Sequence, residues 1–147
     1  MLDGFAWIFD PGHWQGADGI PTRIAEHLAI SIPSVVAAAA LALPIGLAVG
    51  HTGRGAAVAV NLANIGRAVP SYAVMVIVLP ISIRWNAELG LDVVPTVVAM
   101  VLLAIPPILV NAYAGIRAVD PEVVEAARAM GMREREILAR VELPLAL

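Results

Sequence analysis

The sequence predicts an all-α membrane protein, a bundle of helices that crosses the bilayer several times. Hydrophobic residues make up 60% of the 147 residues, and charged residues only 14%, whereas soluble domains are roughly 45–50% apolar even with glycine counted. Mean hydropathy is +0.85. The charges are also clustered, because two long stretches carry none and a third carries a single arginine. A chain of this length allows one domain.

The N-terminal segment, residues 1–26, does not have the pattern of a secretory signal. Asp3 stands where a basic region is expected, and the apolar run Phe5–Phe9 is short. Aromatic residues prefer the lipid headgroup level. Residues 1–19 are therefore interpreted either as a loop or short helix at the membrane surface or as a disordered leader. Residues 21–26 form a polar lead-in to the first span.

The first predicted span is Leu28–Gly50, with 23 uncharged residues, enough for the ~20 that cross the hydrocarbon core. Pro33 and Pro44 are expected to bend it, which neighbouring helices make tolerable. Gly46 and Gly50 form a small-xxx-small pair that allows another helix to approach closely. We interpret this pair as ordinary helix packing, followed by a polar turn at residues 51–55.

The second predicted span covers residues 56–80 and carries Arg67 near its middle. A lipid-facing arginine at that depth costs ~2.5 kcal/mol or more. Steps of three and four residues place four polar side chains in one stripe: Asn61, Asn64, Arg67 and Ser71. We favour a translocation pathway or subunit contact for this stripe. The alternative is that Pro70 breaks the helix and Arg67 reaches the interface.

The third predicted span, residues 93–116, has 24 uncharged residues. Pro106 and Pro107 must distort it near the middle. Its polar members Asn111 and Tyr113 are further pathway candidates. Residues 142–147, E-L-P-L-A-L, have the composition of the start of a fourth span.

Between these two segments the sequence predicts a short capped helix outside the bilayer. Asp120 suits the N-cap, Pro121 the first helical position and Gly131 the left-handed residue that closes the helix. Apolar side chains on one side follow at steps of three and four: Val123, Ala126, Ala127 and Met130. We interpret it as a docking element, with an ordinary amphipathic connector as the alternative.

The arginines predict the orientation of the chain. Residues 117–140 carry five arginines, whereas the 82–92 loop and the N-terminal segment carry one each. Because positively charged loops remain in the cytoplasm, the docking element is expected inside the cell and the N-terminus outside.

The same segment resembles a family signature. Glu125, Ala126, Ala127, Gly131, Leu143 and Pro144 match the pattern E-A-A-x3-G-x11-L-P of ABC importer permeases, with Val141 where isoleucine is usual. The resemblance implies that residues 120–131 are a coupling helix, which inserts into a groove on a cytoplasmic ATPase subunit. Four longer phrases resemble the osmoprotectant branch, whose substrates are glycine betaine, carnitine and choline: E-H-L-A-I-S-I-P-S at Glu26, L-A-L-P-I-G at Leu41, N-L-A-N-I-G-R-A-V-P-S at Asn61 and N-A-Y-A-G-I-R-A-V-D-P at Asn111.

The resemblance also implies the fold and the partners. The family has the type I importer permease fold with five core spans, pairs as two permease subunits and works with an external binding protein. Residues 27–147 would form a partial transmembrane domain with three spans, the coupling helix and the start of a fourth, and the chain looks C-terminally truncated. Relatives commonly have glutamine at the position of Arg67 and often arginine at that of Val110.

Catalytic and metal-binding patterns are absent from the sequence. It has no phosphate-binding G-x-x-x-x-G-K-[ST] loop, and its three histidines lack metal-site spacing. We expect no catalytic residue, no metal site and no cofactor on this chain, with ATP and Mg²⁺ on the partner ATPase. The arginine cluster suits anionic lipid headgroups and the ATPase better than nucleic acid. The alternatives are a permease for an amino acid or oxyanion, and a truncated membrane protein that only docks an ATPase.

Overall fold

The computed structural model describes residues 7–68, 71–91 and 93–146, and these contain helices and no strand. After a helical turn at residues 7–9, a 3₁₀ helix η1 (Pro11–Trp14) precedes the long helix α2 (Ile20–Thr52). Then come α3 (Ala56–Ala68), α4 (Ser71–Trp85), α5 (Ala87–Gly90) and α6 (Val93–Arg117). The chain continues with α7 (Pro121–Ala129), α8 (Glu134–Ile137), a π-helical turn η2 (Leu138–Glu142) and α9 (Leu143–Leu145). The all-α class is confirmed.

Two helices are long and apolar enough to cross a membrane, α2 with 33 residues and α6 with 25. The predicted spans at residues 28–50 and 93–116 lie within them. Helix α2 starts earlier than the predicted span because Pro21 occupies its first turn and the polar residues after it are already helical. It ends at Gly53, whose φ is 67° and whose N–H donates to the Val49 carbonyl, as in a glycine-closed helix terminus.

The second apolar stretch differs from the prediction. A continuous span over residues 56–80 was expected, but α3 and α4 are separate helices whose axes are bent by 82°. The proline alternative has a physical basis, since proline lacks an N–H and clashes with the preceding turn of a helix. Pro70 itself lies outside the described residues. The described residues therefore hold two spans, or three if α3 and α4 together form one broken span.

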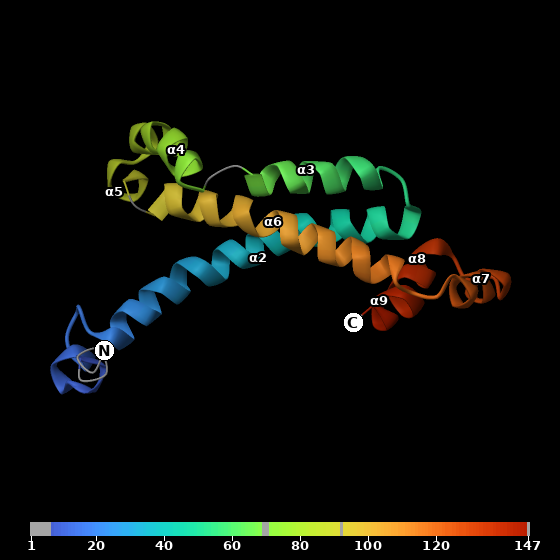
Figure 1. Cartoon of the computed structure of the whole chain (residues 1–147), viewed down its shortest axis with the longest axis horizontal. Coiled ribbons are helices and arrows are strands. Elements are labelled where there is room, and N and C mark those ends of the chain that lie inside the picture. The colour runs from blue at the N-terminus through green and yellow to red at the C-terminus, as the bar shows by residue number, and fades with distance from the viewer. Residues whose placement is uncertain (1–6, 69–70, 92, 147) are drawn as a thin grey trace.

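Helices α2 and α6 cross closely and run in the same chain direction (Figure 1), so their C-terminal ends lie at one end of the molecule. Glycines make the contact. A Cβ atom on Gly46 would lie 2.7 Å from the Leu109 carbonyl oxygen, and one on Gly50 would lie 2.8 Å from the Cβ of Ile116. The buried residues of α2 recur every fourth position: Ser34, Ala38, Ala42, Gly46 and Gly50. The close approach expected of the glycine pair is confirmed, with α6 as the partner.

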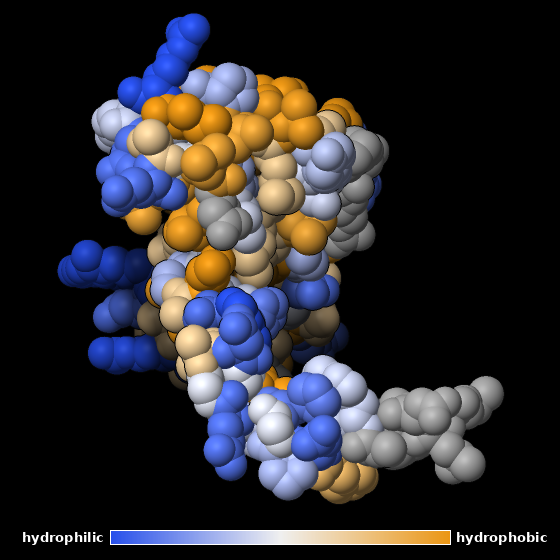
Figure 2. Space-filling view, turned by 90° about the vertical axis from the view of Figure 1, so that its left-hand side faces the viewer, coloured by the Kyte–Doolittle hydropathy of each residue, from blue (hydrophilic) through white to orange (hydrophobic). Residues whose placement is uncertain are grey.

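Much of the apolar surface is uncovered. The first half of α2 projects away from the other helices (Figure 1), and its large side chains such as Ile24 and Ile32 are more than half exposed. Figure 2, which views the end of the molecule near α4, α5 and the N-terminus, shows apolar residues over much of its upper part and hydrophilic residues along its left edge and toward its lower end. Exposed apolar surface on this scale marks contact with a membrane or with other protein.

The turn before α2 is held by local side-chain contacts. The Trp7 and His13 rings stack with centroids 4.1 Å apart, and the Trp14 indole N–H donates to the Ile8 carbonyl at 2.6 Å. The Asp10 carboxylate caps η1 through the Gly12 N–H. Residues 7–14 are thus folded, as the surface-helix interpretation expects, while residues 1–6 lie outside the described residues.

Candidate functional site

Helix α7, here called the docking helix, has the caps that the sequence predicts. The Asp120 carboxylate accepts from the Glu122 N–H at 2.9 Å, and Pro121 is the first helical residue. At the other end, the Gly131 N–H donates to the Arg128 carbonyl at 3.0 Å and the Met132 N–H to the Ala127 carbonyl at 3.3 Å. This pair of bonds is a Schellman motif, which requires the left-handed conformation that Gly131 adopts at φ 85°.

The predicted apolar side of the docking helix divides into two parts. Ala127 is 2% exposed and packs into this chain, whereas Met130 is 76% exposed and Val123 is 42% exposed. Ala126 and Glu125 are also exposed. Because residues 123, 126 and 130 follow helical steps of three and four, they form one outward face, here called the docking face. Ala127 is a support of the helix and is not available to a partner.

The last two residues of the E-A-A…L-P pattern lie apart from the docking helix. Leu143 and Pro144 open α9, which follows directly on the π-helical turn. The carbonyl oxygen of Ala146 lies 3.2 Å from where a Cβ on Gly115 would be, so α9 packs beside the C-terminal part of α6. The sequence pattern therefore covers both the docking helix and the later segment in which the chain returns to the spans.

A side-chain network that the sequence analysis missed connects these elements. At the end of α2, the His51 Nδ1 lies 2.5 Å from the Glu142 carboxylate, and its Nε2 lies 3.2 Å from the Glu134 carboxylate. Glu134 in turn accepts two hydrogen bonds from Arg128, at 2.7 Å from Nε and 3.0 Å from the terminal nitrogen. We call these four residues the His51 network. The Nδ1 contact with Glu142 is a hydrogen bond, whereas Nε2 lies at ion-pair distance from Glu134. Neutral His51 carries one ring N–H and the imidazolium carries two.

The two ends of the His51 network differ in burial. The side chains of His51 and Glu142 are 11% and 6% exposed, so a carboxylate that would be costly to bury alone has a partner. Glu134 and Arg128 are about half exposed. The hydrogen bond from Arg128 holds the pKa of Glu134 below its usual value, and the same bond raises the pKa of Arg128.

A polar cavity of about 210 Å³ lies under the docking helix. It is lined by the ends of α2 and α6 on one side and by the docking helix on the other: Gly50, His51, Ile116, Arg117, Val119, Pro121, Val124, Glu125, Arg128 and Glu142. Apolar packing alone therefore does not attach the docking helix to the spans, because a polar cavity lies between them. His51, Arg128 and Glu142 border this cavity, and the His51 network joins its two sides.

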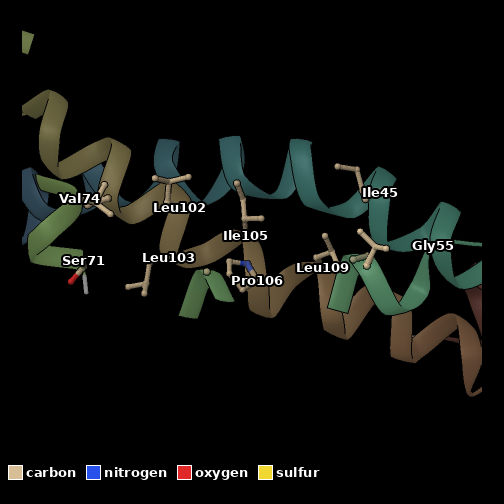
Figure 3. A pocket seen from close by; sticks show the side chains of 13 residues that line it. Ile45, Gly55, Ser71, Val74, Leu102, Leu103, Ile105, Pro106 and Leu109 are labelled. Carbon is tan, nitrogen blue, oxygen red and sulfur yellow. The ribbon is translucent and has the colours of Figure 1, made fainter. Parts of the chain in front are cut away.

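A second cavity of about 710 Å³ lies among α2, α3, α4 and α6 (Figure 3). Its walls are apolar apart from Ser71, with side chains such as Ile45, Leu103 and Leu109 directed toward it. Of the other pathway candidates, Asn61, Asn64 and Asn111 are exposed and Tyr113 is half-buried, and none of them lines this cavity. The side chain of Arg67 lies outside the described residues. Since Ser71 begins α4 across the bend from α3, the expected single polar stripe is not continuous.

The network residues carried weak signals in the sequence. The sequence shows only that the three histidines lack metal-site spacing, and nothing local distinguishes His51 from the others. Glu142 is the acidic residue that directly precedes Leu143 and Pro144, which is the one hint that it belongs to the site. Among the described residues no group of three or more His, Cys, Asp or Glu side chains is placed to hold a metal ion.

Comparison with known proteins shows that the chain is similar to transport system permease proteins. The chain is 34% identical over 121 residues to the choline transport system permease protein OpuBB of Bacillus subtilis, covering 82% of this chain and 52% of that protein. It is 34% identical over 125 residues to the glycine betaine/carnitine/choline transport system permease protein OpuCB of the same organism, covering 85% and 54%. The glycine betaine/proline betaine permease ProW of Escherichia coli is 29% identical over 132 residues, which cover 90% of this chain and 35% of that protein.

The chain thus spans about half the length of the first two relatives. No solved structure matches it. Residues 40–147 match the model of one family, and this match contains the C-terminal part of α2, the α3–α4 pair, α6 and the whole docking region. The chain belongs to the family of binding-protein-dependent transport system inner membrane components.

Proposed function

We propose that this chain acts in a transmembrane permease subunit of an ATP-driven importer for quaternary ammonium osmoprotectants. The observation that carries the proposal is the docking helix, which presents Val123, Ala126 and Met130 outward beyond the C-terminal end of α6. It lies within the part of the chain that matches the family of inner membrane transport components. An exposed apolar face on a rigidly capped helix is suited to a groove on another protein.

The partner in that groove is a cytoplasmic ATPase subunit, which binds ATP and Mg²⁺. Closure of two such subunits moves the docking helices they hold, and the spans follow as rigid bodies between outward-facing and inward-facing states. In this scheme Ala127 anchors the docking helix to its own chain, and the Schellman turn at Gly131 fixes the direction in which the chain leaves it. The permease itself performs no chemistry.

The orientation follows from the charges. Residues 117–140 hold five arginines, which favours the cytoplasmic side for α7 and α8 and the outside for the N-terminus. The aromatic turn before α2 then lies at the outer headgroup level. The exposed apolar faces of α2 and α4 contact lipid or a second permease subunit, and an external binding protein delivers the solute.

The solute class rests on the relatives, whose names specify choline, glycine betaine and carnitine. A quaternary ammonium group has no N–H to donate and is held well by the faces of aromatic rings. The described residues that line the 710 Å³ cavity include no aromatic side chain, so the cavity adds no support for the solute class.

The test is transport by the full-length native permease, reconstituted in liposomes with its ATPase and binding protein. We expect ATP-dependent uptake of radiolabelled glycine betaine, competed by unlabelled choline and carnitine. Competition only by amino acids or oxyanions would replace the solute class while keeping the transporter. ATPase binding without uptake of any of these solutes would overturn the proposal in favour of a protein that only docks the ATPase.

A matched pair of variants tests the docking face. Met130→Asp places a charge on its most exposed apolar residue and should weaken ATPase binding on the order of tenfold. Ala129→Asp adds the same charge one position earlier on the same helix, outside the docking face, and should change binding little. Equal loss in both variants would show that charge near the helix, not the apolar face, determines docking.

A further inference from the structure

The end of the first long helix is tied to the segment that follows the docking helix. His51 is in the last turn of α2, and its two ring nitrogens lie against Glu142, which follows α8, and Glu134, which begins α8. Arg128 on the docking helix holds Glu134 by two hydrogen bonds. Residues 51 and 142 are 91 positions apart. The His51 network is therefore a tertiary link and not a local turn.

The position of His51 is fixed by the close crossing of α2 and α6. Its neighbour Gly50 packs so tightly on Ile116 that an added Cβ would lie only 2.8 Å from the Cβ of that residue. The last turn of α2 consequently has little freedom to slide. His51 is thus held in a fixed position at the end of the first span.

The docking helix, in contrast, is attached to the spans mainly at its edges. Ala127 packs inward, and the 210 Å³ polar cavity lies between the helix and the ends of α2 and α6. A force on the docking face passes to α6 through the short connection at residues 118–120. It reaches α2 through the His51 network, since Arg128 is on the docking helix and His51 is on α2.

We propose that His51 is a positioning residue that transmits displacement of the docking helix to the first span. The inference rests on the proposed transport function. The Arg128–Glu134 pair takes up the movement of the docking helix, and His51 passes it to α2, while the buried Glu142 keeps α2 aligned with the segment that leads into α9. Without this link, a displacement of the docking helix moves α6 but is not transmitted fully to α2.

Three replacements of His51 separate its two contacts. His51→Ala removes both. His51→Asn places its amide N–H near the former Nδ1 and keeps the hydrogen bond to Glu142, whereas His51→Gln reaches the former Nε2 position and keeps the contact with Glu134. His27→Ala is the matched control, because His27 is an exposed histidine on the same helix, and its ring lies 3.3 Å from the hydroxyl of Ser31.

The measurement is solute uptake per ATP hydrolysed by the reconstituted full-length transporter, normalised to the permease in the membrane. We expect His51→Ala to lower this ratio on the order of tenfold, a typical size for coupling between two sites. His51→Asn and His51→Gln should restore part of it, and His27→Ala should leave it unchanged. A fall in uptake and hydrolysis together at constant ratio would overturn the proposal, because a purely structural role predicts that result.

If His51→Ala does not accumulate in membranes, Glu134→Gln decides the question. Glu134 is about half exposed, so its replacement leaves the buried His51–Glu142 pair in place while weakening the link to Arg128. A lowered uptake-to-hydrolysis ratio supports the relay, and an unchanged ratio overturns it. Failure of the proposed function is distinct from both, since the unaltered transporter would then show no ATP-dependent uptake.

Discussion

Helix α2 makes two contacts near its C-terminal end that are built on opposite principles. Where it crosses α6, side chains are missing: Gly46 and Gly50 let the two backbones meet. One residue further, the imidazole ring of His51 contacts the carboxylates of Glu142 and Glu134. The first contact depends on the small volume of the glycines, and the second depends on charge and hydrogen bonding. The crossing has no space for a side chain, so the two helices cannot shift against each other there. The polar contact borders a cavity, so its side chains can change position.

The largest expected effect is on the rigid contact. Gly46→Leu should prevent the crossing, because even its Cβ would meet the Leu109 carbonyl oxygen at 2.7 Å, and backbone cannot yield as a side chain can. Overpacking of this kind costs about 1–3 kcal/mol or more. The thermal unfolding midpoint of the detergent-solubilised protein measures it. Ala48→Leu is the control, since Ala48 is on the exposed side of the same helix. Equal midpoints for the two variants would show that the crossing is not tightly packed.

A smaller effect is expected where the docking helix ends. A Cβ on Gly131 would meet nothing within 4 Å, so the cost of replacing it comes from the left-handed backbone alone. That cost is about 1–2 kcal/mol for an ordinary residue and less for asparagine, which tolerates this conformation. Gly131→Val should therefore reduce ATPase binding and uptake more than Gly131→Asn does. Equal loss from both variants would indicate a steric role against the partner instead.

The smallest effect concerns the exposed half of the His51 network. Because the pKa of Glu134 is lowered by its bond to Arg128, the pair stabilises the turn above the usual glutamate value of 4.5 and loses this contribution as pH falls through the lowered pKa. The protection factors of the amides in residues 128–134, which correct exchange for its intrinsic pH dependence, should fall at acid pH in the wild type. Glu134→Gln should remove this dependence, and high salt should weaken it. An identical acid response in the variant would assign the effect to another group.

Local features of the chain could be predicted from the sequence because their causes are local. Asp120, Pro121 and Gly131 specify the start and end of the docking helix through bonds to residues within five positions. The spacing of Gly46 and Gly50 likewise contains the reason for the close crossing, although it does not name α6 as the partner. Uncharged runs of sufficient length account for α2 and α6 in the same way.

Features that depend on distant parts of the chain were missed. The bend between α3 and α4 decides which side chains share a face, so a periodicity counted through it placed Ser71 with Asn61 and Asn64. Ala127 was grouped with the docking face because alanine suits a packed interior and a partner surface equally well. His51 and Glu142 belong together only after α2 and α6 have crossed, and no pattern within either segment indicates the other.

The small buried residues of α2 also bear on how the first and third spans associate. Glycine and alanine have no side-chain rotamers to lose on burial, and the one hydroxyl in this series, on Ser34, already donates to the Ile30 carbonyl of its own helix. When the two helices come together after insertion into the bilayer, α2 therefore contributes almost no cost in side-chain conformational entropy, and that cost falls on larger residues of α6 such as Ile116. Larger residues at these positions of α2 would increase the distance between the helices and would lose rotamer freedom on burial. The small residues therefore allow close packing and also lower the entropy cost of forming the contact.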